Sequence, residues 1–295
     1  MSLDLPTGRI EGEPEGFYHS CGAISRSMLG DFRRRGPQYF KVRYLSDSEN
    51  INDTDRDTEA LRLGSALHCL LLEPERFSER FAVSPKFDRR TKKGREEAEM
   101  FYSVAGERVV ITEEGFSDVE LMVSAVRAHS GAVNLLSQGS PEITWRVDAG
   151  DFLLQCRTDW IIEDKINNTI TIVDVKADRN APDWLREDFG NPIIRHSYYR
   201  QAAFYTSLVQ EVSGSEVDRF VFLVVGKPEG RGSCEPIDVG LFRVPNDILQ
   251  VGMDEVVGDI QRLSTCINQD EWPSLMGEQE RVLYFSDRVL DRLKS

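Results

Sequence analysis

The chain has 295 residues, of which 40% are apolar and 29% are charged, and its formal net charge is −14 at pH 7. This composition excludes a disordered chain, and no apolar run approaches the roughly 20 residues that cross a bilayer. Residues 1–16 lack the basic and apolar regions of a secretory signal, so we expect a cytoplasmic protein that binds no membrane. The negative charge also argues against a nucleic-acid partner, because phosphate neutralisation requires basic surface.

Residues 1–20 are rich in Gly, Pro and Glu, which predicts an irregular lead-in. We expect the remainder, residues 21–295, to form a single α/β domain. Its core is expected at about 58–245 and its C-terminal helical part at 247–295.

Two helices are predicted in the first part of the chain. A helical pattern follows Ser25 and runs into the basic residues Arg33–Arg35. A second helix, Thr58 to Leu72, carries an apolar stripe and ends before Pro74. The acidic stretch 46–59 holds six acids and one arginine, which is typical of a solvated loop.

A change from helical to alternating periodicity marks the middle of the chain. After a helical segment at 114–136, apolar and polar residues alternate in three runs that short turn sequences separate. This pattern predicts an antiparallel meander in a central mixed β-sheet flanked by helices. The three expected strands cover 143–147, 152–162 and 169–176. The later expected elements are a helix at 197–211, strands at 220–225 and 239–244, a helix at 247–266 and a helical tail beyond Asp270.

The candidate catalytic residues lie on two of these strands. Asp174 and Lys176 are two residues apart, so their side chains leave the same face of the third strand, about 7 Å apart. An ion pair on a solvated face is the simplest explanation, because the D-x-K pattern is common by chance. Asp159 on the neighbouring strand favours another interpretation, since it brings a second carboxylate to the same place.

Two carboxylates together with water and phosphate oxygens suit Mg²⁺ or Mn²⁺, and we expect one or two ions here. Glu142, at the start of the meander, is a third acid within reach. His68 follows Gly64 and Ser65 on its helix, and these small residues leave room for a close approach. A packed histidine is the usual explanation on an apolar helix, but the acids downstream favour a metal ligand.

Four segments in this order resemble the exodeoxyribonuclease VIII (RecE-type) branch of the PD-(D/E)XK nuclease superfamily. The resemblance covers roughly residues 18–210 and implies the nuclease-like α/β core of that superfamily. The four segments are Gly64–Phe77, Cys156–Trp160, Val173–Lys176 and Tyr198–Tyr205.

The resemblance implies a role for each matched position. His68, Asp159 and Asp174 would bind the divalent metals. The Val175 carbonyl would be a further ligand, and Lys176 would be the catalytic lysine.

Three more residues have implied roles. Gln201 and Tyr205 would orient the catalytic site or the DNA, and Glu142 matches a catalytic acid of the first meander strand. The implied activity degrades one strand of linear double-stranded DNA from 5′ to 3′, which leaves 3′ single-stranded tails for recombination. The implied partners are a single-strand annealing protein and further copies of this chain in a ring, and the implied origin is bacterial or phage.

Two alternatives stay open, because the same site serves endonucleases of the superfamily and could persist in an inactive module that binds DNA ends or proteins. An iron–sulfur cluster is disfavoured, since Arg35–Pro37 lacks the early cysteine of the cluster-binding relatives and only Cys266 lies in the tail. The five cysteines are instead expected as free thiols. No nucleotide is expected, because Val225–Lys227 lacks the upstream glycine and the following hydroxyl residue of a phosphate-binding loop.

Basic residues gather in two places despite the net charge. The stretch 86–95 holds six basic side chains and one acid, and Arg33–Arg35 is a second candidate. A solvated loop is the usual explanation of such a run, but its place between the His68 helix and the meander favours contact with DNA phosphates. No base-reading motif is visible, so we expect binding without sequence specificity. The predicted DNA-contacting residues are Arg34, Arg89, Arg90, Lys92, Lys93, Arg95 and Tyr205.

Overall fold

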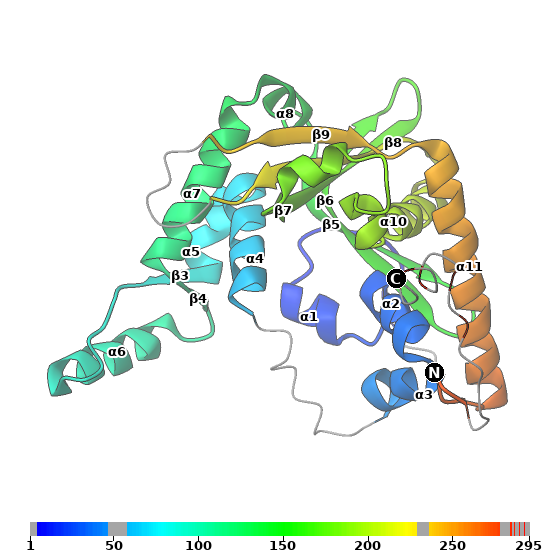
Figure 1. Ribbon diagram of the computed structural model, residues 1–295, viewed down its shortest axis with the longest axis horizontal. Helices are drawn as coiled ribbons and strands as arrows, with labels where there is room; N and C mark the ends of the chain where they lie inside the picture. Colours follow the sequence, from blue (N-terminus) through cyan, green and yellow to red (C-terminus); the bar gives the residue numbers. More distant parts are fainter. Residues whose placement is uncertain are drawn as a thin grey trace.

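The fold is described from a computed structural model, in which helices cover a central β-sheet (Figure 1). The described residues are 5–46, 58–228, 236–277, 284, 286, 289 and 292. Most of the predicted acidic loop 46–59, Cys234 and most of the tail beyond residue 277 lie outside them. Among the described residues, no helix combines the length and apolar character that a bilayer crossing requires.

The central sheet contains seven strands within the described residues. They are β1 Gly8–Ile10, β2 Ile24–Ser25, β5 Ser140–Asp148, β6 Leu153–Asp164, β7 Thr169–Asp178, β8 Glu216–Gly226 and β9 Val239–Arg243. The order is β1-β5-β6-β7-β8-β9, with β2 paired to β6. Strands β5, β6 and β7 form the predicted antiparallel meander, whereas β7 and β8 are parallel and joined by a helical crossover. The predicted mixed α/β fold is confirmed.

Helices lie on both faces of this sheet. On the first face are α2 Arg26–Arg35, α3 Pro37–Phe40, α10 Tyr198–Ser213 and α11 Asn246–Gln269. On the second face are α4 Glu59–Leu72, α7 Glu113–Ala128 and α8 Ser130–Leu135, with the two-stranded parallel sheet of β3 Phe81–Ser84 and β4 Val109–Thr112. Strand β7 supplies both cores by alternation, because Ile170 and Ile172 pack on the first face and Val173 and Val175 on the second.

The remaining helical elements are short or project from the body. They are α1 Glu15–Ser20, a π-helical turn at Lys41–Leu45, 3₁₀ turns at Pro74–Arg76 and Ala181–Leu185, α5 Phe77–Arg80, α6 Lys92–Ala105 and α9 Pro192–Arg195. Helix α6 extends away from the rest of the molecule (Figure 1). The basic stretch 86–95 is therefore only partly a loop, because it enters α6 at Lys92.

The predicted irregular lead-in is partly wrong, because residues 1–20 contain β1 and α1. The cause is Arg146 on β5, a charged residue of the alternating run that is nevertheless fully buried. A buried guanidinium requires acceptors, and it donates to Glu13 Oε1 at 2.8 Å and to the Pro6 carbonyl at 3.1 Å. These contacts fix the N-terminal segment against the sheet.

The predicted helical tail beyond Asp270 is also wrong as far as Gly277, because α11 ends at Gln269 and residues 271–277 contain no helix. The residue after α11, Asp270, has a left-handed backbone (φ 50°), which ends the helix. The described cysteines 21, 69, 156 and 266 are free thiols.

Helix α11 is fixed to its neighbours by an ion-pair network around a buried aspartate. Asp259 is 1% exposed and pairs with Arg33 of α2 at 3.2 Å, with Arg200 of α10, and with Arg262 at 3.7 Å. Because α10 also carries Gln201, this network holds the helix that delivers a candidate site residue to the sheet.

The substitution Asp259→Ala is expected to lower the free energy of unfolding by up to about 3–5 kcal/mol, because it leaves the buried Arg200 with only the partly exposed Glu255 as a counter-charge. Urea denaturation monitored by circular dichroism measures this change. The matched control is Asp254→Ala on the exposed side of the same helix, which should stay within about 0.5 kcal/mol of wild type. Equal effects of the two substitutions would contradict the role of the network.

Candidate metal centre

The candidate site lies where β6 and β7 stop pairing. Their antiparallel ladder reaches the Trp160–Val173 pair, and the same register would next join Asp159 to Asp174. Instead, the Val175 backbone N–H donates to Asp159 Oδ2 at 2.7 Å. A side-chain carboxylate thus satisfies a backbone donor at the point where the two strands separate.

Glu142 reaches the same point from β5. Pro141 pairs with Trp160 and Ile143 pairs with Thr158, so Glu142 stands opposite Asp159 in the register. Its backbone is left-handed (φ 52°), a conformation that costs a non-glycine residue about 1–3 kcal/mol. The site therefore contains a strained backbone at one of its acids.

His68 approaches from α4 and contacts both neighbouring strands. Its Nε2 lies 3.1 Å from the Val175 carbonyl oxygen, and its Nδ1 lies 3.5 Å from Asp159 Oδ2. A carbonyl can only accept, so this hydrogen bond requires a proton on Nε2, and Nδ1 faces the Asp159 carboxylate. Ligand atoms of His68, Glu142 and Asp159 all lie within 4.8 Å of one another. We call these three residues the metal group.

Asp174 lies beside the metal group and is held by other partners. It is 1% exposed, accepts a hydrogen bond from Gln201 Nε2 at 2.5 Å and forms an ion pair with Lys176 Nζ. The predicted common face of Asp174 and Lys176 is confirmed, and the explanation by a solvated face is wrong. The ammonium also lies 5.0 Å from the centre of the Tyr198 ring.

The electrostatics of the site favour a bound cation. Burial raises the pKa of Glu142, and the nearby Asp159 charge raises it further. Burial also raises the pKa of Asp174, although Lys176 opposes this change. Burial lowers the pKa of Lys176, but Asp174 and Asp159 more than offset it, so this pKa lies above its usual value. Two carboxylates and one imidazole in this arrangement fit a hard divalent ion, which would offset their mutual repulsion.

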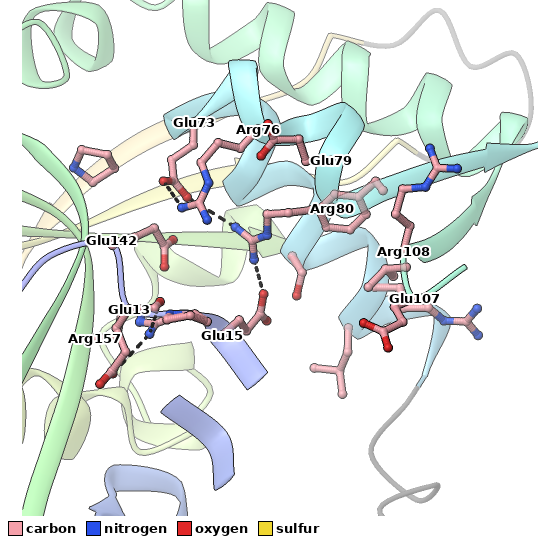
Figure 2. Close-up of a pocket in the computed structure, with 18 of the residues that line it drawn as sticks. Glu13, Glu15, Glu73, Arg76, Glu79, Arg80, Glu107, Arg108, Glu142 and Arg157 are labelled. Atoms are coloured by element: carbon pink, nitrogen blue, oxygen red, sulfur yellow. Dashed lines mark hydrogen bonds and ion pairs between the residues drawn. The ribbon is translucent and has the colours of Figure 1, made fainter. Parts of the chain in front are cut away.

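Two cavities open onto the metal group. The smaller, about 150 Å³, is lined by His68, Glu142 and Asp159, and the larger, about 830 Å³, also reaches Glu142 (Figure 2). The cavities are contiguous, because several residues line both. These shared residues are Glu15, Ser65, Arg80, Glu142 and Arg157.

The structure brings one of the predicted DNA-contacting residues to this site, and the others line neither cavity. Tyr205 of α10 lines the smaller cavity. The basic residues at the start of the α6 arm line neither cavity, and several are paired locally, as in Lys92–Glu96 at 3.7 Å and Lys93–Glu97 at 3.6 Å. These residues are Arg89, Arg90, Lys92, Lys93 and Arg95. Arg34 of α2 pairs with Asp31 at 2.9 Å. Their contact with DNA stays a prediction.

Several residues that line the two cavities were not predicted from the sequence. Arg157 stands two residues before Asp159 on β6, so strand alternation could have placed it beside the site. His19 and Tyr18 also line the smaller cavity. Arg80 carries no local signal, because only the packing of α5 brings it there.

Comparison with known proteins supports the fold. A family model described as a PDDEXK-like domain of unknown function (DUF3799) matches residues 25–282. The crystal structure of a candidate exonuclease from Eubacterium rectale is 14% identical and covers 96% of this chain and 97% of that chain, with a TM-score of 0.60. The structure of SSO0001 is 15% identical and covers 73% of this chain and 96% of that chain, but its TM-score of 0.27 supports no argument. Comparison with curated proteins finds no match.

Saturating Mg²⁺ or Mn²⁺ is expected to raise the melting temperature of the protein, because ligand binding stabilises the native state. At 100 times the dissociation constant the gain is about 2.7 kcal/mol, or roughly 4–5 °C for a chain of 295 residues. Differential scanning fluorimetry with metal and with EDTA measures this shift. Asp159→Asn should lose most of the shift, and Glu163→Gln, an exposed change on the same strand, should keep it. A full shift in Asp159→Asn would contradict the metal group.

Glu142→Gln is expected to raise the melting temperature of the metal-free protein at pH 8 by about 2 °C, which for a chain of this length corresponds to a gain of about 1 kcal/mol in the free energy of unfolding. The pKa of Glu142 is raised in the native state, so this state binds the proton more tightly than the unfolded chain does. Stability therefore falls as pH rises from the unfolded pKa through the native pKa, and glutamine removes this loss. Melting temperatures in EDTA at pH 5 and pH 8 check the sign, with exposed Glu120→Gln as control. A larger gain at pH 5 would refute it.

Proposed function

Because the chain belongs to the PDDEXK-like family DUF3799, we propose that it is a divalent-metal-dependent exodeoxyribonuclease on linear double-stranded DNA. The observation that carries this proposal is the metal group of His68, Glu142 and Asp159 beside the Asp174–Lys176 ion pair. The fold similarity to a candidate exonuclease favours an action at DNA ends over internal cleavage.

The metal group would hold the ion, since it combines one imidazole with two carboxylates in a half-buried position. When bound, a divalent ion polarises a phosphate oxygen and supplies a nucleophile at neutral pH. His68 presents Nδ1 because Val175 holds Nε2, and Asp159 is oriented by the Val175 N–H.

A second set of residues fixes a positive charge next to the metal group. Gln201 orients Asp174, and Asp174 in turn holds Lys176 Nζ. The ammonium would stabilise negative charge that develops on the phosphate while water attacks and the phosphodiester P–O bond breaks. The buried position of Asp174 keeps water from weakening this arrangement.

The proposal is tested with end-labelled linear duplex and with covalently closed circular DNA, each in Mg²⁺ and in EDTA. We expect Mg²⁺-dependent release of mononucleotides from linear DNA only, and labels at the 5′ and 3′ ends report the polarity. Lys176→Met should slow the reaction by about 10²–10³-fold, as the loss of one preorganised electrostatic group does. The matched control, exposed Lys165→Met, should retain the wild-type rate.

Other outcomes would assign another function. Cleavage of the closed circle would identify an endonuclease. Binding of DNA without hydrolysis in any divalent metal would contradict an enzyme and favour a binding module.

A further inference from the structure

Arg80 stands at the junction of the two cavities and lines both of them. We propose that Arg80 binds a phosphate of the nucleic-acid strand that reaches the metal group, and that Glu15 occupies this position when no strand is bound. The inference rests on the proposed function and adds a phosphate subsite and its internal competitor. Figure 2 shows Arg80 between Glu73 and Glu15, with Glu142 nearby.

One edge of the Arg80 guanidinium is fixed by the protein. Its Nη1 lies 3.3 Å from Glu73 Oε2, and Glu73 is only 7% exposed. The other oxygen of Glu73 binds Arg76 Nη1 at 2.7 Å, so this carboxylate is itself held in place. Arg80 is therefore oriented before any ligand arrives.

The other edge of the Arg80 guanidinium contacts a carboxylate that a ligand can replace. Its Nη2 forms an ion pair with Glu15, whose side chain is 45% exposed. An arginine edge recognises carboxylate and phosphate oxygens in the same way, so a phosphodiester can replace the Glu15 carboxylate. The Arg80 side chain is 22% exposed and keeps its contact with Glu73, so the exchange replaces one anionic partner of its outer edge by another.

Glu13 differs from Glu15 although both belong to the N-terminal segment. The Glu13 side chain is 4% exposed and pairs with the fully buried Arg146 at 2.8 Å. Glu13 also holds Arg157, whose Nη2 donates to its backbone carbonyl at 3.0 Å. Glu13 thus anchors the segment while Glu15 can leave Arg80.

The charges of the larger cavity explain why such an exchange is needed. Five arginines and six glutamates line it, so the free cavity offers no surplus of positive charge to a strand. A cation in the metal group and the departure of Glu15 from Arg80 would both shift this balance toward phosphate.

A double-mutant cycle tests the proposal by fluorescence anisotropy of a labelled linear duplex in EDTA, over a range of salt. We expect Glu15→Gln to tighten binding about 3–10-fold and Arg80→Gln to weaken it about 10-fold. Arg80→Gln should also reduce the slope of log affinity against log salt by about 1, as the loss of one phosphate contact does. In the Arg80→Gln background, Glu15→Gln should no longer change the affinity.

The matched control is Glu79→Gln. It also removes one negative charge from the lining of the larger cavity, but Glu79 lies on α5. It should tighten binding by less than 2-fold and should do so equally with and without Arg80. Melting temperatures of all variants identify a merely structural tie between α1 and α5. In that case both single substitutions destabilise the fold and leave DNA affinity unchanged, which overturns the proposal.

The parallel hydrolysis assay in Mg²⁺ separates this inference from the proposed function. Hydrolysis by the wild type together with an unchanged affinity of Glu15→Gln rejects the subsite alone. If the double-mutant cycle gives the expected changes in DNA affinity but no variant hydrolyses DNA, the exonuclease is rejected and the phosphate subsite is retained. Absence of both DNA binding and hydrolysis rejects both.

Discussion

Where β6 and β7 separate, the Asp159 carboxylate accepts the hydrogen bond of the Val175 backbone amide, and the carbonyl of the same residue faces His68. A single residue of β7 thus orients two members of the metal group through its backbone. The positions of Asp174 and Lys176 are set by the same strand. Alternation along β7 directs both side chains to the face of the sheet on which α10 lies. A slip of β7 by one residue would reverse every one of these directions, and the apolar residues on both of its faces oppose such a slip.

The strand elements of this arrangement were predictable because alternation and turn residues are local signals. The meander, the shared face of Asp174 and Lys176, and the helix that carries His68 all follow from patterns within a few residues. Convergence of Asp159 with that strand required only a short turn between two neighbouring strands. Local sequence patterns were therefore sufficient to predict the site residues that lie on adjacent strands.

The parts that were missed depend on contacts between residues far apart in the chain. Arg146 reads as an exposed strand residue, and only the folded protein reveals that Glu13 neutralises it in the interior while the Pro6 carbonyl accepts a hydrogen bond from it. Arg80 enters the site because α5 packs beside α4, and its neighbours in the sequence give no hint of this position. Tertiary ion pairs of this kind leave no periodic trace, so sequence patterns alone cannot locate them.

The buried ion pair of Glu13 and Arg146 shows that the folded unit begins earlier in the chain than the region that the family model matches. The family model begins at residue 25, yet the acid that neutralises Arg146 lies twelve residues earlier. Trimming the chain to the matched region would remove that acid and leave a guanidinium in the interior without its counter-charge, a strongly destabilising change. Homology thus defines a shorter unit than folding does, and fusion partners or tags are better placed before the N-terminal segment than in exchange for it.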